Sequence, residues 1–145
     1  MKMHLNFATS DLGRSIEFYS TLLDARPNKT FSDYALFVTE RPALELALAA
    51  AAAVEPPGDA HYGIVVETLD EVDRAAGRLA KAGLIEAIER EQTCCYANQS
   101  KVWTIDPEKR RWEIYVVHEE TEERGSAGES CCGGRDEASN ACCAG

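Results

Sequence analysis

The chain has 145 residues, of which 45% are hydrophobic, and a formal net charge of -10 at pH 7. This length suits one domain with or without a tail, and the acidic charge argues against nonspecific binding to nucleic acid. The longest apolar run, residues 46–54, is too short to span a membrane, and no signal-peptide pattern opens the chain. We therefore expect a cytoplasmic protein whose six cysteines are reduced.

The first half of the chain predicts a strand, a helix and further strands. Residues 3–9 alternate in polarity as a half-buried strand does. Residues 10–25 then place apolar side chains on one helical face, after a candidate N-cap at Ser10 or Asp11. Residues 34–40 and 43–49 predict two more strands. This order defines a first module over residues 1–55.

The second half repeats this order. A strand is expected over residues 60–68, and Thr68 with Glu71 has the spacing of a capping box at the start of a helix that Gly83 would stop. Later strands are expected within residues 83–89, 94–99, 101–105 and 112–118, with a turn over 106–111. The second module therefore spans residues 58–118, and the prolines and glycine of residues 55–59 mark the joint.

Residues 119–145 differ in composition from both modules. They contain seven acidic and two basic residues and almost no large apolar side chains. Such a segment cannot bury enough surface to offset its ordering entropy, so we expect a flexible acidic tail. The tail carries two cysteine pairs, Cys131–Cys132 and Cys142–Cys143. These pairs could capture a metalloid and pass it to the folded part, or the tail could have no role, and both hypotheses stay open.

Three polar residues occupy matching places in the two modules. His4 and His61 lie in the first strand of each module, and Glu113 lies in the last strand of the second. Taken singly, each would more often be an ordinary strand residue. Because alternate strand residues share a face, all three can point away from the apolar, helix-packed side. Two imidazoles and a carboxylate make a set that suits non-haem Fe(II) and oxygen chemistry.

At these positions the sequence resembles the vicinal-oxygen-chelate superfamily. The segments "HLNFATSDLGRSIEFYSTLLDARP" and "DPEKRRWEIY" are similar to its opening and closing signatures, although Lys109 stands where glycine is usual. The resemblance implies an α+β fold in which paired βαβββ modules form a partial barrel around a divalent metal held by His4, His61 and Glu113. Glu45 occupies the first-module counterpart of Glu113, and its joining the metal would make the site more glyoxalase-like.

The segment "CCYANQSKVW", residues 94–103, is more specific. It resembles the C–As lyases, which are Fe(II)-dependent dioxygenases that cleave trivalent organoarsenicals, such as methylarsenite and trivalent aromatic arsenicals, to inorganic arsenite. Cadmium-induced proteins are relatives of that family. The resemblance implies arsenic detoxification, with Fe(II) as cofactor, O2 as co-substrate and Cys94 and Cys95 as the arsenic ligands. It assigns no catalytic residue beyond the metal ligands.

The chemistry of two adjacent thiols suits this assignment. Trivalent arsenic is soft and prefers thiolates to oxygen ligands. Adjacent strand residues point to opposite faces, so chelation requires Cys94 and Cys95 to sit in a loop, a bulge or at a strand end. The alternative is two buried structural cysteines. Four nearby residues are candidates for lining the substrate pocket, and each is equally well explained as an ordinary strand residue: Tyr96, Gln99, Lys101 and Trp103.

Two further functions stay open. A protein that sequesters arsenite or cadmium without catalysis would also explain the cysteine pairs, although it would leave the two histidines and the glutamate without a role. A glyoxalase-like metalloenzyme would explain the metal ligands and leave the thiols without a role. The sequence gives no oligomeric state.

Overall fold

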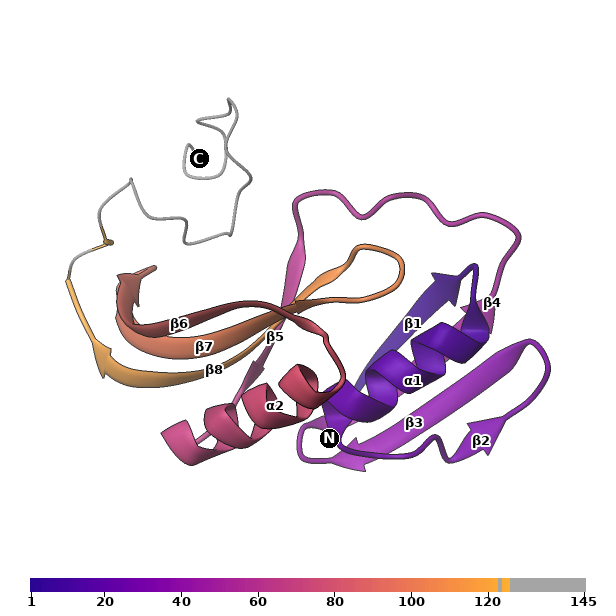
Figure 1. Ribbon diagram of the computed structural model, residues 1–145, viewed down its shortest axis with the longest axis horizontal. Helices are drawn as coiled ribbons and strands as arrows, with labels where there is room; N and C mark the ends of the chain where they lie inside the picture. Colours follow the sequence, from indigo (N-terminus) through magenta and orange to yellow (C-terminus); the bar gives the residue numbers. More distant parts are fainter. Residues whose placement is uncertain (123, 126–145) are drawn as a thin grey trace.

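The computed structural model describes residues 1–122, 124 and 125. The first module forms a four-stranded sheet in the order β1-β4-β3-β2, with β1 parallel to β4 and the other neighbours antiparallel. One helix follows the first strand (Figure 1). Its elements are β1 (Met3–Thr9), α1 (Leu12–Leu23), β2 (Lys29–Thr30), β3 (Tyr34–Glu40) and β4 (Ala43–Ala50).

The second module repeats this arrangement, with the strand order β5-β8-β7-β6 and the parallel pair β5 and β8. The α+β class and the paired βαβββ modules are thereby confirmed. The last strand runs two residues past the predicted boundary at 118. Its elements are β5 (His61–Val65), α2 (Leu69–Lys81), β6 (Ile85–Cys94), β7 (Ala97–Ile105) and β8 (Arg111–Glu120).

Local sequence explains where the helices begin and end. The Asp11 side chain accepts a hydrogen bond from the Arg14 amide at 3.0 Å, which settles the choice between Ser10 and Asp11 as N-cap. Thr68 and Glu71 form the predicted capping box at the start of α2. Gly83 follows α2 with a φ of +68°, which an L side chain rarely adopts.

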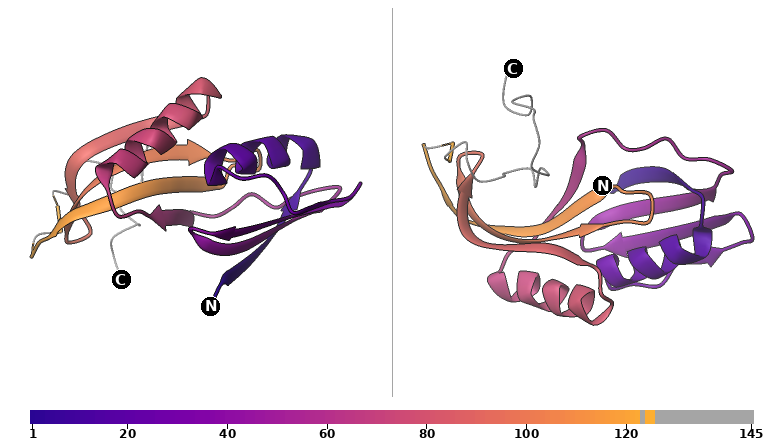
Figure 2. Two further views of the ribbon diagram at one scale, coloured as in Figure 1. Left: turned by 90° about the horizontal axis from the view of Figure 1, so that it is seen from below. Right: turned by 45° about the horizontal axis from the view of Figure 1, so that its top comes forward.

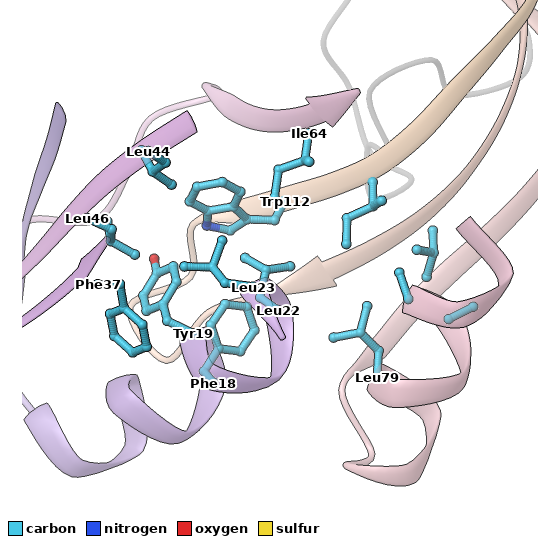
Figure 3. Close-up of a cluster of buried hydrophobic side chains, with 14 of the residues drawn as sticks. Phe18, Tyr19, Leu22, Leu23, Phe37, Leu44, Leu46, Ile64, Leu79 and Trp112 are labelled. Atoms are coloured by element: carbon cyan, nitrogen blue, oxygen red, sulfur yellow. The ribbon is translucent and has the colours of Figure 1, made fainter. Parts of the chain in front are cut away.

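The two modules share one apolar core on the helix side of both sheets. Figures 1 and 2 place α1 and α2 next to each other on the same side of the molecule. Trp112 stacks on Tyr62 with ring centroids 4.9 Å apart, and Tyr62 meets Phe7 of the other module at 5.2 Å. Side chains of both modules, among them Tyr19 and Trp112, therefore fill the same interior (Figure 3).

The turn between β7 and β8 ties the modules together. Arg110 donates from Nη2 to the Ala8 carbonyl at 2.8 Å, and its guanidinium lies over the Phe7 ring. The Glu108 carboxylate accepts hydrogen bonds from the Ser10 amide at 2.7 Å and the Thr9 hydroxyl at 3.0 Å. Burial opposes the charge of Glu108, but these bonds outweigh it and lower the pKa of the carboxyl.

A buried hydrogen bond joins α1 to the same turn. Tyr19 donates its hydroxyl to Asp106 at 2.7 Å. Burial, reinforced by the Asp106 charge, raises the pKa of Tyr19. Among the described residues, no helix is both long and apolar enough to cross a bilayer.

Candidate functional site

The first strand of each module places its histidine on the face away from the helices. In β1, His4, Asn6 and Ala8 are exposed, whereas Phe7 and Thr9 are buried. In β5, His61 and Val65 are likewise exposed and Ile64 is buried. The alternation expected from the sequence is therefore present, and both histidines face solvent on the side opposite the core.

Glu113 lies beside His61 on this face of the second sheet. Its Oε1 is 3.5 Å from His61 Nε2, and its Oε2 accepts from Lys101 Nζ at 2.8 Å. Glu113 is only 7% exposed, so Lys101 compensates a carboxylate that is largely removed from water. Gly63 leaves room for this pair, since a Cβ there would lie 3.2 Å from Glu113 Oε1 and 3.0 Å from the Tyr115 ring.

Lys101 is the most enclosed cation on this face. Its Nζ lies 5.3 Å from the centroid of Trp103 and 5.6 Å from that of Tyr115. Burial opposes the charge of Lys101, but the hydrogen bond and charge of Glu113, with the charges of Cys94 and Glu89, outweigh it and raise the pKa of Lys101. Lys101 and Trp103 thus share a face with Glu113.

His4 lies in a different half of the molecule. Its Nδ1 is 3.7 Å from Oε2 of Glu45, its register partner on β4. Within residues 1–122, 124 and 125, no three His, Cys, Asp or Glu side chains come together to hold a metal ion. Of the predicted ligands, His61 and Glu113 therefore lie together, whereas His4 lies with Glu45 on the other sheet.

Cys94 and Cys95 meet at the tip of the β6–β7 hairpin. Cys94 ends β6, and Cys95 and Tyr96 form the turn with φ values of 55° and 67°. Positive φ at both central residues is typical of a type I′ hairpin turn. The two Sγ atoms are 3.2 Å apart, with Cys94 buried and Cys95 exposed. The pair thus occupies a strand end, which satisfies the requirement for chelation, whereas residues 94–99 do not form the separate strand expected.

Several contacts brace this turn. Gln99 donates from Nε2 to the Cys94 carbonyl at 3.1 Å. The segment after β8 runs beside the hairpin, because the Cys95 amide donates to the Arg124 carbonyl and the Thr121 amide donates to the Tyr96 carbonyl. Gly125 packs so closely that a Cβ there would lie 2.3 Å from the Thr93 carbonyl oxygen.

The remaining candidate residues are placed as follows. Tyr96 is half-exposed in the turn, Gln99 is buried behind it, and Trp103 donates its indole N–H to Glu89 at 3.0 Å. The tail cysteines, Cys131, Cys132, Cys142 and Cys143, lie outside the described residues. A cleft of about 440 Å³ between the modules is lined by residues such as Arg41, Glu71 and Arg78, and it contains none of the candidate residues.

Sequence reasoning missed two contributors to this site. Gly63 makes room for Glu113. The sequence could have indicated this role, because Gly63 lies two residues after His61, on the same face of the strand, and has no side chain to pack there. Glu89 fixes Trp103, and no local pattern distinguishes it from the other acidic residues of β6. Both depend on strand pairing, β5 with β8 for the first and β6 with β7 for the second.

A fold of paired βαβββ modules, with histidines and carboxylates on the sheet faces opposite the helices, defines the class of protein. The family model described as the Glyoxalase/Bleomycin resistance protein/Dioxygenase superfamily matches residues 3–114, and the chain belongs to this family. A crystal structure of a glyoxalase/bleomycin resistance protein/dioxygenase from Alicyclobacillus acidocaldarius has the same fold. It gives a TM-score of 0.65 at 17% identity, over 82% of this chain and 92% of that one.

Two relatives are closer in sequence. The chain is 37% identical to a trivalent organoarsenical cleaving enzyme of Bacillus sp. (strain MD1), over 89% of this chain and 81% of the relative. It is also 37% identical to a cadmium-induced protein of Mycobacterium bovis, over 86% of this chain and 82% of the relative.

Proposed function

We propose that this protein cleaves the carbon–arsenic bond of trivalent organoarsenicals to release inorganic arsenite, in a reaction that uses Fe(II) and O2. The observation that carries the proposal is the pair of sulfur atoms held 3.2 Å apart at the tip of the β6–β7 hairpin. The name of the Bacillus relative supports the same substrate class. The iron and oxygen requirement rests on the resemblance of the sequence to the C–As lyases.

The thiols provide the substrate-binding chemistry. An organoarsenical such as methylarsenite carries one carbon substituent and two exchangeable oxygen substituents. Cys94 and Cys95 can each form an As–S bond as an As–O bond breaks, and the two oxygens leave as water with the two thiol protons. Arsenic stays trivalent in this exchange, and the As–C bond is left directed away from the hairpin. The thiolate is the reacting form, so this exchange is faster at higher pH.

The surroundings of the pair favour access from one side. Cys95 is exposed and can meet the arsenical first, whereas Cys94 is 3% exposed and closes the chelate. Cys94 is also among the charges that raise the pKa of Lys101. The Lys101 ammonium thus interacts electrostatically with both Cys94 and Glu113. We assign it the role of stabilising negative charge on these two groups.

The tail pairs are proposed as the first capture site. Thr121 and Arg124 contact the hairpin through the backbone of Tyr96 and Cys95, so the chain enters the tail beside the thiol pair. An arsenical bound by a cysteine pair of the tail would reach Cys94 and Cys95 by thiol exchange. The alternative is that the tail has no role in uptake.

A second candidate function is favoured by the cadmium-induced relative. In that case the thiol pairs would sequester a soft metal without catalysis. The deciding experiment incubates anaerobic protein with methylarsenite and Fe(II), then admits air and separates the arsenic species by chromatography. The lyase gives inorganic arsenite only after air enters, and Cys94→Ser and Cys95→Ser give none. Tight binding without release of arsenite would identify the sequestering protein.

A further inference from the structure

The turn of the β6–β7 hairpin brings two adjacent thiols together, which a regular strand would not do. Adjacent strand residues point to opposite faces of the sheet. Cys95 and Tyr96 have positive φ values, so the backbone leaves the extended conformation directly after Cys94. The two Sγ atoms consequently lie 3.2 Å apart. Because a disulfide bond is about 2.05 Å long, an approach of about 1.2 Å would join the two sulfurs.

The backbone of this cysteine pair is held on both sides. Cys94 pairs with Ala97 at the end of the β6–β7 ladder, and its carbonyl accepts a hydrogen bond from Gln99 Nε2 at 3.1 Å. The Cys95 amide donates to the Arg124 carbonyl, also at 3.1 Å. The two thiols therefore stay close to each other in the folded chain. A reaction between them is favoured by proximity over a reaction with a thiol from solution.

The two thiols differ in their access to solvent. Cys95 is exposed, whereas Cys94 is 3% exposed, so a reagent from solution meets Cys95 first. Lys101 interacts electrostatically with Cys94, and its ammonium thereby stabilises the Cys94 thiolate, which is the form that attacks an oxidised sulfur. An accessible thiol next to a second thiol that can resolve its oxidised form is the arrangement found at redox-sensitive cysteines.

We propose that Cys95 is a site of oxidation by hydroperoxides, and that the oxidised sulfur closes to a disulfide with Cys94 that blocks the arsenical site reversibly. The Cys95 thiolate attacks the O–O bond and becomes a sulfenic acid, while the peroxide leaves as an alcohol, or as water from hydrogen peroxide. The Cys94 thiolate then attacks the Cys95 sulfur and displaces its hydroxyl, which leaves as water. In sum, two thiols and one hydroperoxide give one disulfide, one alcohol and one water, and the two electrons lost by the thiols reduce the O–O bond.

The disulfide and the arsenic chelate exclude each other, because both use the same two sulfur atoms. A bound arsenical should therefore protect the thiols from peroxide, and oxidation should prevent arsenical binding. The ring closed by two adjacent cysteines is strained, and strained disulfides are the more easily reduced, so a small dithiol should reopen it. This inference rests on the proposed function where it concerns the arsenical site, whereas the oxidation itself requires neither arsenic nor metal.

The test treats the full-length chain with hydrogen peroxide after its other four cysteines have been changed to serine, namely Cys131, Cys132, Cys142 and Cys143. After quenching in acid, an alkylating reagent labels the remaining thiols, and mass spectrometry of the intact chain counts the labels. The expected product has lost two hydrogens, takes no label and has the mass of a single chain. Dithiothreitol should restore both labelled thiols. Titration should show methylarsenite binding before oxidation and after reduction, but not in between, and methylarsenite added before the peroxide should preserve both thiols.

Two matched variants of this chain test the role of each thiol. Cys94→Ser keeps the exposed thiol and should stop at the sulfenic acid, seen as one added oxygen that dimedone traps. Cys95→Ser keeps only the buried thiol and should react with peroxide about tenfold more slowly. Circular dichroism checks that both variants keep the fold. Equal rates in the two variants would overturn the assignment of Cys95 as the oxidised thiol.

The outcomes separate this inference from the proposed function. If peroxide leaves both thiols labelled, adds oxygen to Cys95 without closing the disulfide, or links two chains, the inference is overturned. Methylarsenite binding by the untreated chain would still support the proposed arsenical site in each of these cases. A disulfide between Cys94 and Cys95 that forms without loss of methylarsenite binding would contradict both, because the arsenical would then bind elsewhere.

Discussion

The backbone conformation of Tyr96, in the turn of the β6–β7 hairpin, predicts that glycine is a more stable replacement than alanine at this position. Within a regular strand or helix the opposite order is usual. Tyr96 has a φ of 67°, in the left-handed region. A Cβ in that region costs roughly 1–2 kcal/mol, whereas glycine adopts it freely but loses roughly 0.5–1 kcal/mol more backbone entropy on folding. Tyr96→Gly should therefore be more stable than Tyr96→Ala by about 0.5–1 kcal/mol, and the comparison cancels the lost packing of the tyrosine ring.

The assay is thermal unfolding followed by circular dichroism in the presence of a reductant. For the two modules, about 120 residues, the unfolding entropy is about 0.25 kcal/mol/K, so the expected difference in Tm is about 2–4 °C in favour of glycine. Ile88, which is 46% exposed in β6, supplies the control, because alanine should be the more stable replacement there. Both Tyr96 variants keep the two thiols and should still bind methylarsenite. An alanine variant as stable as the glycine variant would refute the left-handed turn.

Three other predictions concern the ion pair, the turn that joins the modules and the tail. Lys101→Met leaves the buried Glu113 carboxylate without its lysine partner, so the free energy of unfolding should fall by about 3–5 kcal/mol. Adding Glu113→Gln should restore most of the lost stability, and urea unfolding measures both changes. The pKa of Glu108 is lowered in the fold, so its contribution to stability is complete above its unfolded pKa of about 4.3. Glu108→Gln should accordingly lower Tm at pH 7, and the difference should vanish as pH falls through the lowered pKa; an equal difference at pH 3 would contradict this. Deleting residues 126–145 should leave Tm unchanged but slow the uptake of methylarsenite in stopped-flow measurements, and unchanged uptake would show that the tail captures nothing.

The elements that the sequence predicted well are those with a local cause. The helix face of α1 and the capping box of Thr68 and Glu71 depend on residues within one or two turns of each other. The alternation in β1 and β5 likewise predicted that His4 and His61 face away from the core.

The features that the sequence did not predict have non-local causes. The hairpin turn at Cys95 and Tyr96 lacks the glycine or asparagine that usually marks a type I′ turn. Pairing between β6 and β7, together with backbone hydrogen bonds to Thr121 and Arg124, holds it instead. The two-residue strand β2 is too short for any periodic pattern. The separation of His4 from His61 follows from how the modules pack, which is decided by contacts such as that from Arg110 to Ala8, 102 positions apart.

The thiol pair lies in the same sheet as one predicted metal ligand, Glu113, and in a different sheet from another, His4. Cys94, Lys101 and Glu113 belong to β6, β7 and β8, which are hydrogen-bonded neighbours in one sheet. The thiol pair and Glu113 are therefore placed relative to each other by one sheet, whereas His4 belongs to the other sheet. His4→Ala changes only the first sheet and should leave the thiol pair as it is. Arsenical binding by Cys94 and Cys95 should consequently survive this substitution, and a titration with methylarsenite that shows weakened binding would contradict the independence of the two sheets.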